Sequence, residues 1–327
     1  MRAITLEEMI ELSPDYSTTR LVTREVPIIE EPPDASFKTV LSLPEGEGRQ
    51  GEGGLRTQGY FKRSLPEKPL ITVITVVFNG AQYLEETILS VIRQTYDNVE
   101  YIIIDGGSTD GTLDIIQKYE HAIDYWVSEK DEGIYDAMNK GITLATGVII
   151  GLINSDDWYA EKAFNIIIKE ACCKKNVLIY GNIISHFSTG HKMLHQVQLP
   201  KGKQDVNTVL HPTVFISLDV YKRIGLFNTK YQISSDYDLM IRAYIGGVEI
   251  IKTDFILANF RDGGASSGNK GGKERIEIAK SFNFSTRKII KEYLYYYKRL
   301  LKLTIKRHCS FLLKIIRNLR NYDGSTY

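Results

Sequence analysis

The stretch GVIIGLINSDDW, residues 147–158, joins an apolar run to a pair of acidic residues. Its first seven residues are rich in β-branched side chains, which is typical of a strand buried on both faces of a parallel sheet. Asp156 and Asp157 therefore follow a strand end, where open α/β sheets bind ligands. Adjacent carboxylates repel each other unless a cation lies between them, and a hard divalent ion bound with a nucleotide's phosphates fits this pattern. The alternative is that one carboxylate caps a helix beginning near Ala160.

Strand and helix patterns alternate from Leu70 up to this stretch. We expect strands at residues 71–78, 99–104, 125–128 and 147–153, and helices at 81–94, 109–119 and 135–145. Such strand–helix units with short connections predict an α/β fold with a Rossmann-like, doubly wound, mostly parallel sheet. After Trp158 the pattern is mixed, with helices over 162–172 and 235–245 and strands over 177–186, 192–198 and 213–217.

Polar residues follow the other expected strands of the parallel half. Phe78-Asn79-Gly80 follows the first, Asp105-Gly106-Gly107-Ser108-Thr109-Asp110-Gly111-Thr112 the second, and Asp131-Glu132-Gly133 the third. Because the carboxyl ends of parallel strands lie at one edge, we expect these segments to build one site. Asp105 is suited to accept a hydrogen bond from a ribose hydroxyl or a base N–H. The alternative is that it only stabilises a turn, because Asp-Gly is a common turn pair. For Ser108 and Asp110 helix N-capping is favoured.

Composition sets broad limits on the class of protein. The chain has 327 residues, 43% hydrophobic and 25% charged, and its net charge of +1 gives no general case for nucleic-acid binding. Its three cysteines include no C-x-x-C pair, so we expect neither a zinc nor a redox site and a reduced, cytoplasmic setting. Acidic residues soon after Met1 argue against a secretory signal, and no apolar run reaches the roughly 18 residues of a membrane span.

Five segments, in this order, resemble the family 2 glycosyltransferases of GT-A fold that act in bacterial capsule, lipopolysaccharide and exopolysaccharide assembly. The segments are residues 74–79, 105–112, 131–141, 154–158 and 235–239. Each motif is weak alone, but five in register are specific.

The resemblance implies a role for each matched residue. Phe78, Asn79, Asp105 and Asp131 fall where the family holds the nucleoside of a nucleotide-sugar donor. Asp156 and Asp157 match the aspartates that bind Mg²⁺ or Mn²⁺ beside the donor diphosphate. Asp236 matches the catalytic base, which takes a proton from the acceptor hydroxyl as that hydroxyl attacks the anomeric carbon. Direct attack with no covalent intermediate inverts that carbon.

The chain departs from the family pattern at its acidic pair, which reads Ser235-Asp236 and lacks the first carboxylate. Asp238 is a rival base, but two residues further along a helix it faces elsewhere. Asn154 stands where many relatives carry Asp, so we expect only Asp156 and Asp157 to bind the metal.

A second set of departures concerns the phosphate and acceptor sides. Met138 stands where an arginine is common, so Lys140 is a candidate for a phosphate-facing charge, with a solvent-facing helix lysine as its alternative. The absence of a Gln-x-x-Arg-Trp motif favours a non-processive hexosyltransferase that adds single sugars. His211 lies where relatives approach the acceptor or diphosphate, and a structural histidine is the alternative.

Two further features have open interpretations. Residues 261–266 form either a loop that closes over the donor or an ordinary Gly-rich loop. Trp158 either fills the core, which is favoured, or stacks on an acceptor sugar.

We expect three regions in the chain. An N-terminal extension, partly irregular and rich in Gly at 46–54, contains a short helix over 5–12 opened by a capping box. The regions are the extension at 1–68, the glycosyltransferase domain at 69–265 (a nucleotide-binding half at 69–158 and an acceptor half at 159–265), and a basic amphipathic helical region at 266–327.

Basic residues recur through 287–320 against the single acid Glu292, with apolar residues between them. Helices of this type lie on anionic membrane surfaces, so we expect peripheral contact with the inner face of the cell membrane. Packing on the chain's own domain, a homodimer and nucleic-acid binding are the alternatives.

These observations together predict an inverting, metal-dependent enzyme that transfers one sugar from a UDP- or dTDP-linked donor to a glycan or polyprenyl-linked acceptor in surface polysaccharide assembly. A sugar-nucleotide pyrophosphorylase is one alternative, although it needs a basic Gly-rich loop where this chain has Phe78-Asn79-Gly80. An inactive sugar-nucleotide binder or membrane scaffold is the other, because the acid before Asp236 is missing.

Overall fold

The computed structural model describes residues 6–171, 174–206, 210–263, 270–298, 300–301 and 304. The chain divides into two compact units, Met1–Gly264 and Ala265–Tyr327. Cys172, Cys173 and Cys309 lie outside the described residues, as does most of the basic region.

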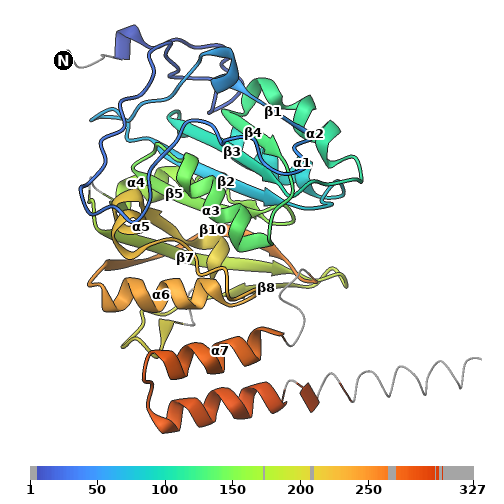
Figure 1. Cartoon of the computed structure of the whole chain (residues 1–327), viewed down its shortest axis with the longest axis vertical. Coiled ribbons are helices and arrows are strands. Elements are labelled where there is room, and N and C mark those ends of the chain that lie inside the picture. The colour runs from blue at the N-terminus through green and yellow to red at the C-terminus, as the bar shows by residue number, and fades with distance from the viewer. Residues whose placement is uncertain are drawn as a thin grey trace, which may run out of the picture. The chain divides into compact units, whose positions relative to one another are not determined.

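The first unit contains a sheet of ten strands within the described residues, in the order β1-β4-β3-β2-β5-β9-β7-β10-β6, with β8 paired to β7 (Figure 1). The strands are β1 (Gly51–Gly53), β2 (Ile71–Val77), β3 (Val99–Asp105), β4 (Tyr125–Ser128), β5 (Ile149–Asn154), β6 (Trp158–Tyr159), β7 (Val177–His186), β8 (Lys192–His195), β9 (Phe215–Ser217) and β10 (Glu249–Arg261). The α-helices are α1 (Leu84–Ile92), α2 (Thr112–Lys118), α3 (Ile134–Leu144), α4 (Ala163–Ala171), α5 (Leu218–Ile224) and α6 (Ser235–Ile245).

The parallel half, β4-β3-β2-β5, has helices on both faces, which confirms the doubly wound α/β prediction. Ile71, Val73 and Val77 of β2 point into a core shared with α1, α2 and α4. Ile74 faces the other side and meets α3 at Gly141, where any Cβ would overlap the Ile74 side chain. Figure 1 shows α3 across the near face of the sheet. Successive side chains of β2 thus serve opposite layers.

The other half of the sheet is mixed, as predicted. Strand β9 is antiparallel to both β5 and β7, whereas β10 runs parallel to β7. Two strands and one α-helix of this half have no counterpart in the sequence-based prediction, namely β6, β10 and α5. Register shifts interrupt β10 between Lys252 and Ala258, so its residues do not alternate regularly between the two faces.

The N-terminal extension pairs with the sheet, which corrects two expectations. The stretch expected to be irregular contains β1, which pairs with β4 from Gly51 to Gly53. The helix expected over 5–12 is wrong, because only a 3₁₀ turn forms at Leu6–Glu8 and the backbone of Ile10 pairs with Val22. A helix this short is poorly stable without tertiary support.

A buried ion pair connects the extension to the amino-terminal edge of the sheet. Arg56 Nη2 lies 2.6 Å from Glu100 Oε1, and both side chains are almost fully buried. Glu100 also accepts hydrogen bonds from the Thr72 hydroxyl at 2.6 Å and from the Thr146 amide at 2.9 Å. Burial raises the pKa of Glu100, but Arg56 and these donors outweigh it, so the pKa stays below its ordinary value.

The second unit contains α7 (Lys270–Ser281) and a helical stretch over residues 286–298. The two contact each other through Arg275 and Glu292, whose Nε and Oε2 lie 3.3 Å apart, and through Lys280, which donates to the Tyr293 hydroxyl. Ile290, Leu294 and Leu301 expose more than half of their surface. Within the described part of the chain, no helix combines the length and apolar character needed to cross a membrane.

Candidate active site

The carboxyl ends of the four parallel strands lie at one edge of the sheet, called here the rim. The β2 residue Val77 is in register with Asp105 of β3, and Asp105 with Ser128 of β4. Val76 is in register with Asn154 of β5. The motifs that follow these strands therefore begin side by side, as the sequence predicts.

Asp105 is fully buried and holds the loops of the rim together. It accepts hydrogen bonds from the Ser108 amide at 3.0 Å, from the Ser108 hydroxyl, and from the Ser128 hydroxyl at 2.5 Å. The Ser108 oxygen in turn accepts the amide of Asn79 at 2.7 Å. Both Asp105 oxygens thus have partners within the protein, and contact with a nucleoside stays a prediction.

The expected helix capping by Ser108 or Asp110 is wrong, because Gly111 is the N-cap residue of α2 and no side chain makes a capping hydrogen bond there. Ser108 does not cap a helix, because its hydroxyl serves Asp105 and Asn79. Asp110, one residue before that cap, accepts the amide of Thr112, the first residue of α2, at 3.1 Å, and also the amide of Ala81. A short polar side chain here satisfies amides that have no partner inside the helix.

Phe78 and Asp131 lie on either side of Gly106. Phe78 is 65% exposed although it directly follows a buried strand. A Cβ at Gly106 would lie 3.4 Å from Phe78 Cδ2 and 2.5 Å from Asp131 Oδ2, so any larger residue there would displace the Asp131 carboxylate. Burial raises the pKa of Asp131, partly opposed by its hydrogen bond from the Gly133 amide. An exposed aromatic ring beside a carboxylate can stack on a base and bind a hydroxyl.

Lys140 lies close to this group but is already paired. Its Nζ is 3.0 Å from Glu129 Oε1 and 3.6 Å from Asp136 Oδ2, and it donates to the carbonyl of Lys130. The side chain is therefore neither free in solvent nor unpaired. A phosphate-facing role would require it to exchange one of these partners.

Asp156 and Asp157 differ sharply in environment. Asp157 is fully buried, and its Oδ1 accepts the amide of Arg261 at 3.0 Å. Its Oδ2 is buried with no hydrogen-bond partner among the described residues. Burial, and then the charge of Asp156, raise the pKa of Asp157 to about 8. Such an oxygen needs a proton or a cation beside it.

The residues here fit a divalent cation of the kind that nucleotides carry. Asp156 is half-buried at the rim, and burial raises its pKa as well. No cluster of three or more His, Cys, Asp or Glu that could hold a metal occurs in the described ranges. One or two carboxylates completed by phosphate oxygens are a normal Mg²⁺ site. The capping alternative is excluded, because β6 follows Asp157 directly and α4 begins only at Ala163.

Arg261, at the end of β10, contacts the acidic pair and was assigned no role of its own from the sequence. Its Nε donates to the Asp156 carbonyl at 3.3 Å and its Nη2 lies 2.6 Å from Glu86. The guanidinium lies 4.1 Å from the ring centre of Tyr83 and 4.9 Å from that of Trp158. Trp158 is therefore partly buried against a cation, and the favoured core interpretation holds only in part.

Asp236 lies at the start of α6, beside two residues from other elements. The hydroxyl of Tyr135, from the first turn of α3, lies 3.4 Å from Asp236 Oδ1 and donates to the Ile233 carbonyl at 2.9 Å. Burial lowers the pKa of His211, and the Asp236 charge opposes that shift. Since α3 begins directly after Asp131-Glu132-Gly133, Tyr135 links the rim to Asp236.

The neighbours of Asp236 cannot replace its carboxylate. Asp238 is buried and its Oδ2 lies 2.8 Å from Arg242 Nε. Arg242 also donates to the carbonyls of Ile224 and Leu226, so the pair fixes the chain that follows α5. Ser235 is fully buried. Asp236 is thus the carboxylate of this helix turn that remains accessible.

The N-terminal extension also reaches the rim. Arg49 Nη2 lies 2.7 Å from Glu129 Oε2, and the amide of Gln50 donates to the Ser128 carbonyl at 2.8 Å. The exposed side chain of Gln50 brings Nε2 within 3.5 Å of a Cβ placed on Gly107. The sequence does not predict this contact between the extension and the rim, because the Gly-rich composition of 46–54 is not typical of a strand.

The chain shows clear similarity to known glycosyltransferases. Residues 72–230 match the model of Glycosyl transferase family 2. A PGL/p-HBAD biosynthesis glycosyltransferase of Mycobacterium bovis is 28% identical over 214 residues, which cover 63% of this chain and 82% of that protein. An uncharacterized glycosyltransferase of Rickettsia typhi is 31% identical over 188 residues, 53% of this chain and 58% of its own.

Solved structures share the fold. TarS 1-349 of S. aureus superposes with a TM-score of 0.52 at 18% identity, over 70% of this chain and 71% of that one. The match covers 43% of the longer TarS chain. The mannosyltransferase PcManGT of Pyrobaculum calidifontis gives a TM-score of 0.54 at 17% identity, over 70% of each chain. The fold is thus that of GT-A glycosyltransferases, as the sequence motifs predicted.

The lowered pKa of His211 predicts a pH-dependent stability. The unfolded chain protonates this histidine below its ordinary pKa of 6.5, whereas the folded protein resists protonation until lower pH. The wild type should therefore lose stability as pH falls below about 6.5. His211→Asn removes this contribution, so the stability difference between variant and wild type, measured by urea unfolding, should be smaller at pH 5.5 than at pH 7.5. An equal difference at both pH values would contradict the assignment.

Proposed function

We propose, since residues 72–230 match the model of Glycosyl transferase family 2, that this protein transfers a single sugar from a nucleotide-sugar donor to a glycan or lipid-linked acceptor, with inversion at the anomeric carbon. The observation that carries the proposal is the register of β2, β3, β4 and β5, which collects the polar motifs on one rim. Tyr135 then connects that rim to Asp236.

The nucleoside would occupy the side of the rim formed by Phe78, Asn79 and Asp131. Phe78 offers an exposed ring face for the base, and Asp131 a carboxylate for a ribose hydroxyl. The backbone of Asn79 has a positive φ of 52°, and its amide donates to the Ser108 hydroxyl, so the protein itself holds this turn in shape. Structures of the same fold bind such donors: TarS was solved with UDP-GlcNAc, and PcManGT with GDP-Man and Mn²⁺. For this chain we propose a UDP- or dTDP-linked sugar as the donor.

The donor diphosphate would lie beside Asp156, with Asp157 behind it. Asp156 and the unpartnered oxygen of Asp157 are the protein groups that would hold Mg²⁺ or Mn²⁺. When bound, such an ion neutralises negative charge on the departing nucleoside diphosphate. Arg261 holds the Asp156 backbone in place through its carbonyl.

Asp236 would act as the general base. The acceptor hydroxyl oxygen forms its bond to the anomeric carbon while the bond from that carbon to the diphosphate oxygen breaks. The hydroxyl proton passes to Asp236, and the nucleoside diphosphate leaves with the bonding electrons. Because the hydroxyl attacks from the face opposite the departing diphosphate, in one step with no covalent intermediate, the configuration at the anomeric carbon inverts. Tyr135 and His211 position this carboxylate from α3 and from the 3₁₀ turn at His211–Thr213.

The basic C-terminal region would bring the enzyme to a lipid-linked acceptor at the inner face of the cell membrane. Its described part carries Ile290, Leu294 and Leu301, exposed and spaced along one side of the chain, among Lys and Arg residues. This arrangement suits the headgroup boundary of an anionic membrane. We also propose that the chain has three regions, at 1–68, 69–265 and 266–327. A homodimer would form through the region at 266–327.

The two alternative functions, a pyrophosphorylase and an inactive binder, require different residues at the rim. A pyrophosphorylase needs a basic Gly-rich loop after β2, and none is present between Phe78 and Ala81. An inactive binder would bind the donor but show no dependence on Asp236. Activity measurements on Asp236 variants therefore separate it from an enzyme.

Phe78 should contribute strongly to nucleotide affinity. Phe78→Ala removes a stacking partner, and loss of one base–aromatic stack costs about 1–3 kcal/mol. We expect UDP to bind about tenfold more weakly, measured by calorimetry. Phe255→Ala is the matched control, because Phe255 is 57% exposed on β10 and has no place in the proposed site. Equal losses in both variants would refute the nucleoside position.

Asp236 should be required for transfer but not for donor binding. Asp236→Asn keeps the size of the side chain and should lower kcat by about 10²–10⁴-fold, with UDP affinity within about twofold of wild type. Asp238→Asn should instead cost about 1–3 kcal/mol of stability, because it leaves Arg242 poorly paired. The reverse pattern, in which Asp238→Asn abolishes turnover of the folded protein and Asp236→Asn does not, would move the base to Asp238.

A further inference from the structure

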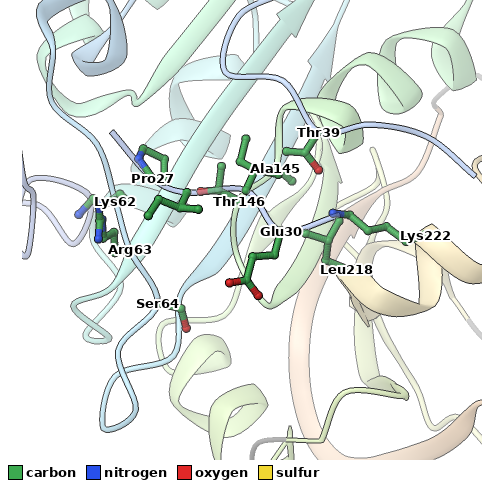
Figure 2. Close-up of a pocket in the computed structure, with 12 residues that line it drawn as sticks. Pro27, Glu30, Thr39, Lys62, Arg63, Ser64, Ala145, Thr146, Leu218 and Lys222 are labelled. Carbon is green, nitrogen blue, oxygen red and sulfur yellow. The ribbon is translucent and has the colours of Figure 1, made fainter. Parts of the chain in front are cut away.

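The N-terminal extension contacts both ends of the parallel strands. At the amino-terminal end it lines a pocket together with Ala145 and Thr146, which precede β5 (Figure 2). Lys222 of this pocket is paired within the protein, because its Nζ lies 2.6 Å from Glu31 Oε2. The contact of the extension with the rim, at residues 46–50, differs because it leaves a polar side chain exposed.

The backbone of Gln50 is held in place at the rim. Its amide donates to the Ser128 carbonyl at 2.8 Å, and the next residue, Gly51, is in register with Ser128 in the β1–β4 pair. On the other side, Arg49 Nη2 lies 2.7 Å from Glu129 Oε2, and both of these side chains are mostly buried. Gln50 therefore has a defined position, although its own side chain is exposed.

Two consecutive glycines bring the Gln50 side chain close to the proposed nucleoside position. A Cβ on Gly107 would lie 3.5 Å from Gln50 Nε2. A Cβ on Gly106, the preceding residue, would lie next to Phe78 and Asp131. Because successive Cα atoms are only about 3.8 Å apart, an aromatic ring, a carboxylate and an amide gather around one short stretch of backbone. Backbone without side chains lets a ligand approach closely.

A base bound here needs a hydrogen-bonding partner that Asp105 does not supply in this structure. Asp105 is fully buried, and Ser108 and Ser128 donate to both of its oxygens. Phe78 offers a ring face, which stacks on any base without distinguishing its edge. Gln50 is exposed, and its side-chain amide makes no hydrogen bond within the part of the chain that the structure describes. It is therefore available to a ligand.

We propose that Gln50 is a specificity-determining residue that binds the base of the nucleotide-sugar donor. A side-chain amide has an acceptor oxygen and two N–H donors. Uracil and thymine present an N–H at N3 beside a carbonyl oxygen at O4, so Gln50 Oε1 accepts the N3 hydrogen while Nε2 donates to O4. The base lies against Phe78 and the ribose at Asp131. This inference rests on the proposed function and adds to it a residue from outside the family-matched residues 72–230.

The test measures nucleotide binding to the full chain by calorimetry. Gln50→Met keeps the length of the side chain but removes both hydrogen bonds, so UDP should bind about tenfold more weakly, the usual contribution of two neutral hydrogen bonds. UDP methylated at N3 of the base blocks the same contacts from the ligand side. It should bind the wild type at least about tenfold more weakly than UDP does, and Gln50→Met should weaken it no further.

Gln58→Met is the matched control, because Gln58 is an exposed glutamine of the same extension at the other end of β4, where the Leu55 amide donates to the Ile123 carbonyl. It should leave the UDP affinity unchanged. Equal UDP affinity in wild type and Gln50→Met would overturn this inference alone, as would a loss in Gln50→Met that is equally large for the N3-methylated ligand. If the wild type does not bind UDP, the proposed donor and this inference fail together.

Discussion

The rest of the structure depends on the parallel register of β2, β3, β4 and β5. Because these strands end level with one another, residues that follow them in distant parts of the chain meet at one rim. The buried carboxylate of Asp105 then determines how the loops leave the sheet, since a buried charge requires hydrogen-bonding partners. Ser108 and Ser128 supply those partners. The Ser108 hydroxyl also accepts a hydrogen bond from the amide of Asn79, so Asp105 positions Asn79 through Ser108. The shape of the rim is thus set by an interaction that water cannot reach.

The acidic pair shows the opposite arrangement, in which the protein leaves a charge incompletely satisfied. Asp157 has one oxygen bonded to the Arg261 amide and one with no partner among the described residues, and its pKa is raised to about 8. An ionised group with these surroundings destabilises the ligand-free protein. Perturbed groups of this kind gather at functional sites, where a ligand completes them. Asp238, whose charge Arg242 matches, has the character of a structural residue in comparison.

Much of the fold could be predicted because its signals are local. A β-branched run marked β2, and apolar periodicity marked α1 and α2. The motifs after each strand then placed Phe78, Asp131 and Asp156 on one rim, although their ligand roles remain predictions. What escaped prediction depends on contacts between distant residues. Strand β1 exists because β4 offers it an edge, β10 is interrupted by register shifts, and Arg261 and Gln50 reach the rim from elements outside the motifs. No pattern within a short window records such pairings.

The most direct test of the account is a crystal structure of the full chain with a UDP-sugar and Mn²⁺. The account predicts the base against Phe78, a ribose hydroxyl at Asp131, the ion at Asp156, and the anomeric carbon turned toward Asp236. It would be contradicted by a donor bound away from this rim, or by a Mn²⁺ ion that contacts neither Asp156 nor Asp157.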